Sequence, residues 1–175
     1  MPCADRSPDA RAGALDDLLR RLGIEAPRYE HPAVMTVAES ERCVPSLPGA
    51  KTKNLFLRDK KGARHFLVTV PAHRPVDFAV LGAALDAGRL GFASAARLQR
   101  CLGVTPGSVS LLALINDADG AVEFVIDRKL WEADAVQAHP LVNTATLVLA
   151  HEDLARFLAA TGHAPHIVDD PAVAR

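Results

Sequence analysis

The chain has 175 residues, of which 49% are hydrophobic and 23% are charged, and its formal net charge is −1. These values fit one compact domain with a full core, and they exclude a protein that coats nucleic acid through bulk charge. We find no apolar run that could span a bilayer and no signal-peptide pattern, so we expect a cytoplasmic protein without membrane contact. Cys3, Cys43 and Cys101 are widely spaced, which predicts free thiols in small buried positions and no zinc site.

The first third of the chain predicts a tail followed by helical and extended segments. Residues 1–12 lack an apolar period, and we expect a flexible tail there before a single domain over 13–170. Leucines at helical spacing over 15–22 predict a helix that Gly23 closes. A short extended segment at 28–32 follows. Thr36 and Glu39 have the spacing of a capping box, which predicts a helix through Cys43.

The middle of the chain predicts a hairpin and two helices. Asn54–Arg58 and Arg64–Val70 are apolar strands around a turn at 59–62. Helices are expected over Asp77–Ala87, and from Ser94 to a cap at Gly103.

The last third predicts a second hairpin and a closing helix. The apolar runs Leu111–Ile115 and Val122–Ile126 flank a turn at 116–120. Further expected elements are a helical turn near Trp131, a segment at 136–139, a strand at 144–149, a helix at 152–160 and an edge strand at 167–168. Paired strands with inserted helices indicate an α+β domain, with a mixed, largely antiparallel sheet or partial barrel surrounded by helices.

Basic residues concentrate in one stretch of an otherwise balanced chain. They are Lys51, Lys53, Arg58, Lys60, Lys61 and Arg64. Lys53 and Asn54 stand immediately before an apolar strand, where a cation and an amide can hold a phosphate or polarise a carbonyl. The alternative is an exposed, solvated basic turn.

The histidines give weaker signals. His163 and His166 could share a metal, but no other ligands accompany them, so we interpret them as solvated loop residues. His65 and His73 are expected at the surface. His139 precedes a proline, so it can form the wall of a pocket or be a satisfied interior histidine. A serine-hydrolase elbow is absent from the sequence.

One set of motifs resembles a known family. They are Lys51–Asp59, Ile115–Asp117, His139–Leu141, Asn143–Thr144 and the stretch 153–163. Together they resemble the aminoacyl-tRNA deacylases, the YbaK-like proteins related to the editing domain inserted in bacterial prolyl-tRNA synthetase. The similarity runs from about Arg28 to Asp169, and it is greatest to the free-standing proteins that remove alanine from tRNA(Pro).

The resemblance implies hydrolysis of the ester between a mischarged amino acid and the terminal adenosine of tRNA, without a metal or organic cofactor. The family's essential lysine falls on Lys53, its neighbouring asparagine on Asn54, and the histidine that borders the amino-acid pocket on His139. Local tRNA-backbone contacts are then expected at Lys51, Lys60, Lys61 and Arg64. The implied partner is the tRNA acceptor end, not DNA, and prolyl-tRNA synthetase and an elongation factor are candidate protein partners.

One position departs from the family pattern and three functions stay open. The family often has a glycine two places before the pocket histidine, where this chain has Gln137, which affects the expected shape of the pocket. Removal of alanine is the leading hypothesis. A deacylase for cysteine or serine is one alternative, and a non-catalytic module that binds tRNA or a synthetase is the other.

Overall fold

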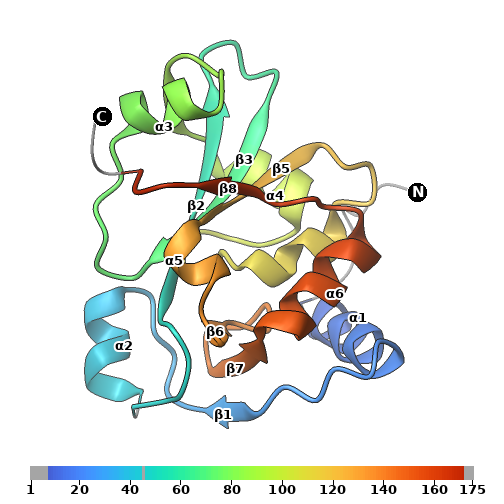
Figure 1. Cartoon of the computed structure of the whole chain (residues 1–175). Coiled ribbons are helices and arrows are strands. Elements are labelled where there is room, and N and C mark those ends of the chain that lie inside the picture. Colours follow the sequence, from blue (N-terminus) through green and yellow to red (C-terminus); the bar gives the residue numbers. More distant parts are fainter. Residues whose placement is uncertain (1–7, 45, 172–175) are drawn as a thin grey trace.

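The computed structural model describes residues 8–44 and 46–171 (Figure 1). Its helical elements are α1 (Pro8–Arg21), α2 (Val37–Cys43), α3 (Phe78–Ala84), α4 (Ala95–Leu102), the 3-10 helix η2 (Leu111–Asn116), α5 (Arg128–Trp131) and α6 (His151–Thr161). Its strands are β1 (Arg28–Glu30), β2 (Thr52–Asp59), β3 (His65–Pro71), β4 (Leu90–Phe92), β5 (Val122–Asp127), β6 (Ala135–Ala138), β7 (Ala145–Ala150) and β8 (His166–Val168). No helix in the described ranges is long and apolar enough to cross a membrane.

The strands form two sheets. A five-stranded sheet has the order β4-β2-β3-β5-β8, and a three-stranded sheet has the order β1-β7-β6. The pairs β2–β3, β2–β4, β1–β7 and β6–β7 are antiparallel, whereas β3–β5 and β5–β8 are parallel. An isolated bridge between Ala50 and Val136 connects the two sheets without closing them into a barrel. The predicted mixed, largely antiparallel α+β fold is confirmed.

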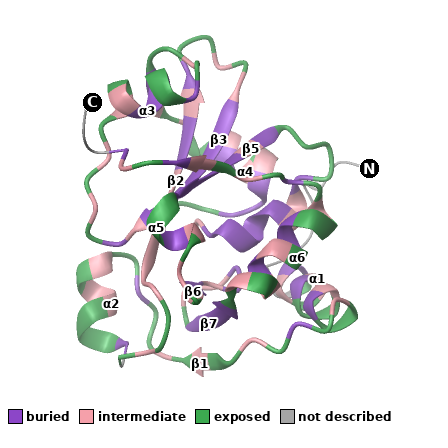
Figure 2. Cartoon of the chain, viewed as in Figure 1, coloured by how far each residue is buried: buried purple, intermediate pink, exposed green. Residues whose placement is uncertain are grey.

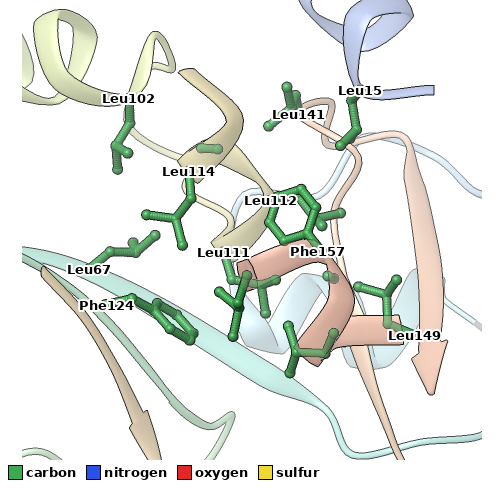
Figure 3. Packing of buried hydrophobic residues seen from close by; sticks show 14 of the residues in the cluster. Leu15, Leu67, Leu102, Leu111, Leu112, Leu114, Phe124, Leu141, Leu149 and Phe157 are labelled. Atoms are coloured by element: carbon green, nitrogen blue, oxygen red, sulfur yellow. The ribbon is translucent and has the colours of Figure 1, made fainter. Parts of the chain in front are cut away.

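The large sheet is buried on both faces. Residues His65 to Val70 of β3 are all buried, which is typical of a central strand covered on both sides. Leu67 and Phe124 face the larger core with η2, α4 and α6, as Figure 3 shows for part of that cluster. Phe66 and Val125 face a second core under α3. In Figure 2 the buried positions concentrate in β3, β5 and η2, whereas α2 has none.

The second predicted hairpin is wrong. Leu111–Ile115 lies in η2, and β5 pairs in parallel with β3 instead of with this segment. The side chain of Ser110 accepts a hydrogen bond from the backbone N–H of Leu112, which starts the helix. Leu111, Leu112 and Leu114 are all fully buried, so the segment is apolar all round because the core surrounds it. A short apolar run of this kind does not distinguish a strand from a buried helix.

Two further boundaries differ from the expectation. Residues 8–12 of the predicted tail are helical, because α1 begins at Pro8, and residues 1–7 lie outside the described part of the chain. Strand β4 was not expected; only three residues long, it pairs with Leu57–Asp59.

Local end signals are confirmed at several helices. Thr36 and Glu39 make both hydrogen bonds of the capping box at α2. Asp77 and Ser94 cap α3 and α4, and Gly103 and Gly162 end α4 and α6 in the left-handed conformation. These caps satisfy backbone groups that a helix end leaves without partners, so they fix where each helix begins or stops.

A buried pair joins the end of α6 to the turn before β5. The His163 Nε2 lies 3.0 Å from Asp117 Oδ2, and the Asp117 carboxylate also accepts hydrogen bonds from the backbone N–H groups of Ala121 and Val122. Burial alone would raise the pKa of Asp117, but these hydrogen bonds hold it below its usual value. His163 is therefore a buried structural residue, and its interpretation as a solvated loop residue is wrong.

Removal of this carboxylate should destabilise the fold. We expect Asp117→Ala to lower the free energy of unfolding by about 3 kcal/mol, because it leaves buried donors without an acceptor. The matched control is Asp119→Ala, an exposed position in the same turn, which should change stability by less than about 0.5 kcal/mol. Urea denaturation of both variants measures the difference, and equal midpoints would contradict the structural role of the pair.

Candidate active site

The best-defined cavity lies where α2, the start of β2 and the end of β6 meet. Its volume is about 210 Å³. Its walls come from the segment 34–37 and Ser40, the stretch Lys51–Asn54, Gly107 and Val109, the segment 137–139, and Thr146. This volume is smaller than the roughly 300–1,000 Å³ of pockets for drug-sized ligands. The cavity therefore suits a small group such as an amino-acid side chain and the ester beside it.

The cavity lies beside the first half of β2. Strand β4 pairs only with Leu57–Asp59 and the Ala93 N–H donates to the Phe56 carbonyl, so in the described part of the chain no strand pairs with residues 52–55 on that edge. Hydrogen bonds instead connect the start of β2 and the residues before it to β6. The Ala50 N–H donates to the Ala135 carbonyl, the Gln137 N–H donates to the Ala50 carbonyl, and the Thr52 hydroxyl donates to the Gln137 carbonyl at 2.7 Å.

Lys51 and Lys53 bring two positive charges to this wall. Both residues line the cavity, and we find no hydrogen bond or ion pair to either ammonium group from the residues that the structure describes. Partial burial lowers the pKa of Lys53 from its ordinary value. A cation without a protein carboxylate partner can accept an anionic or developing negative group from a ligand.

Asn54 is oriented by the neighbouring strand. It pairs with Thr69 in the β2–β3 register, and the Thr69 hydroxyl donates to Asn54 Oδ1 at 2.7 Å. This hydrogen bond uses the oxygen of the amide and leaves its nitrogen as a donor. Asn54 and Lys53 both line the cavity, and as neighbours in β2 their side chains project from opposite faces of the strand.

His139 forms part of the opposite wall. Its Nδ1 donates to the Ala145 carbonyl at 2.9 Å, its own carbonyl accepts from the Ser110 hydroxyl at 2.6 Å, and its ring lies edge-on to His31. Burial lowers the pKa of His139, with a smaller contribution in the same direction from Lys51. The imidazole is therefore neutral at pH 7 and held in one orientation, as the wall of a pocket requires.

Gln137 has a specific structural role at the position where the resemblance led us to expect glycine. Its side-chain nitrogen lies 3.1 Å from the carbonyl oxygens of Leu47 and Gly49 and 3.3 Å from that of Pro48. Gly49 in this loop has a φ of +84°, and a Cβ there would lie 3.1 Å from the Ala135 carbonyl oxygen. Gln137 thus fixes the loop that leads into Lys51 and Lys53.

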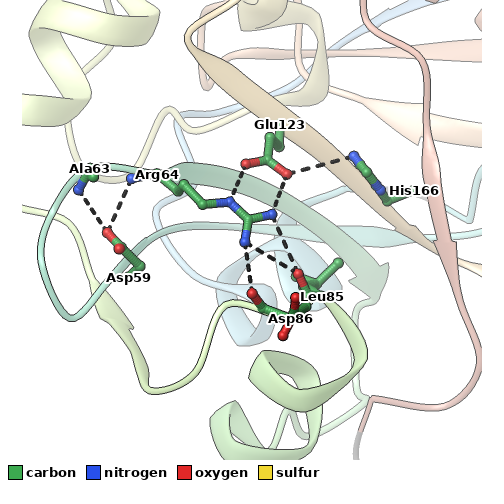
Figure 4. Close-up of polar contacts among 7 residues, drawn as sticks. All are labelled: Asp59, Ala63, Arg64, Leu85, Asp86, Glu123 and His166. Atoms are coloured by element: carbon green, nitrogen blue, oxygen red, sulfur yellow. Dashed lines mark hydrogen bonds and ion pairs between the residues drawn. The ribbon is translucent and has the colours of Figure 1, made fainter.

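The other basic candidates lie elsewhere. Lys60 and Lys61 are at the far end of the β2–β3 hairpin. Arg64 makes a bidentate ion pair with Glu123, with N–O distances of 2.7 and 2.8 Å, and also bonds the Asp86 carbonyl (Figure 4). It lines neither the cavity nor the hairpin tip. The structure therefore divides the predicted basic stretch into separate groups.

Several single-residue expectations need correction. His65 is buried and stacks on Phe56, although we expected it at the surface, whereas His73 is exposed as predicted. Cys43 is exposed and Cys101 half-buried, so the prediction of buried thiols is wrong for Cys43. Cys3 lies outside the described residues.

Part of the cavity could not be predicted from the sequence. Val34, Val109 and Thr146 line it but come from three separate loops or strands, so no spacing rule connects them. The described residues hold no group of three or more His, Cys, Asp or Glu side chains that could bind a metal ion.

Comparisons with known proteins show the family of the chain. The model of the aminoacyl-tRNA editing domain matches residues 31–157. The prolyl-tRNA synthetase associated domain-containing protein 1 of Danio rerio is 42% identical over 156 residues, covering 88% of this chain and 84% of the relative. The prolyl-tRNA editing protein ProX of Acetoanaerobium sticklandii is 38% identical over 145 residues, covering 83% and 88%.

The fold comparison points the same way. A crystal structure described as that of a candidate trans-editing enzyme for prolyl tRNA synthetase has a TM-score of 0.67 at 21% identity, and the match covers 94% of this chain and 98% of the other. This level of likeness shows a shared fold. From the family model and the sequence relatives, the chain belongs to the aminoacyl-tRNA editing domain family.

The lowered pKa of His139 has a consequence for stability. Because the folded protein holds this pKa below the ordinary value of 6.5, the unfolded chain binds the proton first on acidification. The contribution of neutral His139 to the free energy of unfolding is complete above about pH 6.5. As the pH falls below this value, the contribution decreases by at most about 1.4 kcal/mol per pH unit. Burial lowers the pKa of His65 as well, so His65 contributes in the same direction.

We therefore expect the free energy of unfolding to decrease between pH 7.5 and 5.5, and to decrease less in His139→Asn. Urea denaturation at both pH values measures this. An equal decrease in the variant and the wild type would show that His139 is not held neutral by the fold.

Proposed function

We propose that the chain is a hydrolase that deacylates mischarged aminoacyl-tRNA, with alanyl-tRNA(Pro) as its preferred substrate. The observation that carries the proposal is the small cavity bordered by Lys53, Asn54 and His139 in a chain of the editing domain family. The ProX relative, named as a prolyl-tRNA editing protein, and the relatives named for association with prolyl-tRNA synthetase support the choice of tRNA(Pro).

The proposed reaction needs no nucleophile from the protein. An aminoacyl ester is an activated bond, and water adds to its carbonyl carbon to form a tetrahedral oxyanion. Collapse of this intermediate breaks the bond to the ribose oxygen, which takes a proton, and releases the free amino acid. The protein has to position the ester and stabilise the negative charge on the carbonyl oxygen.

The residues of the cavity fit these tasks. The Lys53 ammonium group stabilises the oxyanion or binds the terminal phosphate, and the Asn54 amide nitrogen orients the ester. A hydroxyl group of the substrate's own ribose helps to activate the water. Lys51, on the same wall, adds positive charge for the phosphate.

Selectivity is proposed to come from size. A synthetase pocket built for a larger residue discriminates against a smaller one by only about 1–3 kcal/mol per methylene, whereas a separate small pocket can exclude the larger residue sterically. In this cavity of about 210 Å³, the His139 ring is held by its hydrogen bond to the Ala145 carbonyl. The ring therefore keeps its position and excludes the larger proline side chain.

The charge at position 53 should be essential for turnover. We expect Lys53→Ala to lower kcat/KM on alanyl-tRNA(Pro) by at least about a hundredfold, because removal of an oxyanion donor has an effect of this order. Thermal unfolding should be nearly unchanged, since the described structure shows no bond to this ammonium group. The matched control is Lys129→Ala on α5, an exposed lysine outside the cavity. Near-normal turnover by Lys53→Ala would refute its role.

The same assay identifies the function class and the substrate. Wild type is tested on tRNA(Pro) charged with alanine, cysteine, serine or proline. Fastest hydrolysis of the cysteinyl or seryl ester would assign a different small amino acid. Tight, salt-sensitive binding of tRNA without cleavage of any ester would identify a non-catalytic binding module.

The His139 ring should determine the size limit. We expect His139→Ala to reduce the ratio of kcat/KM for alanyl over prolyl ester by at least about tenfold, because the enlarged pocket admits proline. The control is His73→Ala, an exposed histidine that pairs with Glu41. An unchanged ratio in a folded His139→Ala protein would overturn the assignment of His139 to the wall.

A further inference from the structure

A second cleft lies at the opposite end of β2 from the candidate active site. We call it the hairpin-tip cleft, and its volume is about 420 Å³. It is lined by Arg58, Lys60, Lys61, Gly62, Phe92, Ala93, Ser94 and Arg97. Figure 1 shows the β2–β3 turn projecting on the side of the molecule away from α2, whereas α2 lies beside the start of β2.

The charges of this cleft are not neutralised locally. Half of its lining residues are basic and none is acidic. Arg58 donates to the carbonyls of Asp59 and Lys60, and Arg97 donates to the Gly62 carbonyl and contacts His65 Nε2 at 2.9 Å, so among the described residues neither guanidinium group is paired with a carboxylate.

The carboxylate of Asp59, in the same turn, is directed toward backbone N–H groups of that turn. Asp59 Oδ1 accepts the N–H groups of Ala63 and Arg64 at 2.7 and 3.0 Å, and Asp59 is buried. Lys60 and Lys61 are exposed, and we find no ion pair to either in the described part of the chain. The tip therefore presents a fixed excess of positive charge to solvent.

An aromatic side chain stands within this basic surface. Phe92 is 65% exposed, and its ring contacts Phe78 edge-on with centroids 5.3 Å apart. A single exposed apolar side chain is common on protein surfaces, so what distinguishes Phe92 is its place among basic residues. An aromatic face among lysines and arginines suits RNA, because phosphates pair with the cations while a base or sugar packs on the ring.

The two sites are joined by one strand. Lys53 lies near the start of β2 and Lys60 directly after its end, seven positions on, which at about 3.3 Å per residue is a separation of at most roughly 23 Å. An RNA duplex is A-form and rises less per base pair than the roughly 3.4 Å of B-DNA, so a short RNA arm spans this distance. A single tRNA acceptor arm can therefore reach both ends of the strand.

We propose that the hairpin-tip cleft is a second RNA-binding site, which holds the phosphate backbone of the substrate tRNA while the aminoacyl end occupies the cavity at Lys53. Lys60, Lys61 and Arg97 bind phosphate oxygens, and Phe92 packs on a sugar or base of the same strand. This inference rests on the proposed function, since it takes tRNA as the substrate. It adds a contact that determines tRNA affinity without touching the ester.

The test compares substrates that reach one site or both. The double variant Lys60→Ala/Lys61→Ala is measured against Arg21→Ala/Lys129→Ala, which removes the same charge from exposed positions outside both clefts. The substrates are full-length alanyl-tRNA(Pro) and the alanyl ester of a CCA trinucleotide. A second measurement gives the Kd of each protein for uncharged tRNA(Pro) as a function of KCl concentration.

We expect the tip variant to lose about tenfold in kcat/KM on full-length tRNA, mostly through KM, and to keep wild-type activity on the trinucleotide ester. Its salt slope for tRNA binding should fall by about 1 per lysine removed, whereas the control variant stays near wild type. Phe92→Ala should weaken binding at least about fivefold with the salt slope unchanged, because stacking carries no charge.

The failures of the two proposals can be distinguished. If the tip variant and the control variant bind tRNA equally, or if the tip variant loses the same factor on both substrates, the second site is refuted and the deacylase proposal stands. If wild type hydrolyses neither ester, the deacylase proposal fails, and the comparison of Kd values still decides whether the cleft binds RNA.

Discussion

The candidate site depends on the seam between the start of β2 and β6. This seam consists of the backbone bonds of Ala50 to Ala135 and Gln137, and of the Thr52 hydroxyl to the Gln137 carbonyl. It joins the two sheets at the point where β2 has no partner strand on one edge. Without this seam, the Lys51 and Lys53 segment at the start of β2 and His139 after β6 would belong to separate sheets. With it, they face one small cavity.

The seam also explains how the site tolerates Gln137. A glycine there would leave the loop at 47–49 to be held by backbone contacts alone, whereas the two N–H groups of the glutamine amide are shared among three successive carbonyls of that loop. Buried polar groups stabilise a structure when they are satisfied in this way. The departure from the family pattern therefore changes how the Lys51 and Lys53 segment is held, and Gln137 itself lines the cavity.

The electrostatics of the cavity favour a substrate that brings the negative charge. The titratable residues that line it are Lys51, Lys53 and His139, and burial lowers the pKa of His139. No Asp or Glu is among the described residues that line it. A carboxylate partner would pair with the ammonium groups before the reaction and weaken their electrostatic attraction to an oxyanion. An uncompensated cation in a partly desolvated site interacts strongly with charge that develops nearby, because the local dielectric is lower than that of water.

The sequence predicted those features that depend on local chemistry. Thr36, Ser94, Gly103 and Gly162 act on backbone groups within a few residues, so their effect can be read from the chain. The Lys53–Asn54 pair is predicted from its place beside an apolar run and from its resemblance to the family motif, although both residues lie inside β2 and not before it. His65 and His163 were misjudged because their burial depends on Phe56 and Asp117, and the His163 partner is 46 positions away.

The assignment of Leu111–Ile115 as a strand failed for a related reason. Both a central strand and a helix enclosed by the core appear as an uninterrupted apolar run, and only the neighbours decide between them. Here β5 already has β3 and β8 on its two edges, so the sheet has no place for another strand beside it. The run instead fills the space between the two sheets as η2.

Strand β2 gives the molecule its functional geometry. Its first residues form the wall of the cavity, and its last residues lead into the basic hairpin tip. Between them, Phe56 and Leu57 are buried in the two cores on opposite faces of the sheet, so packing on both sides holds the strand. A strand fixed in this way keeps a constant distance between its ends. A tRNA held at the tip would therefore deliver its aminoacyl end to Lys53 without any change in the fold.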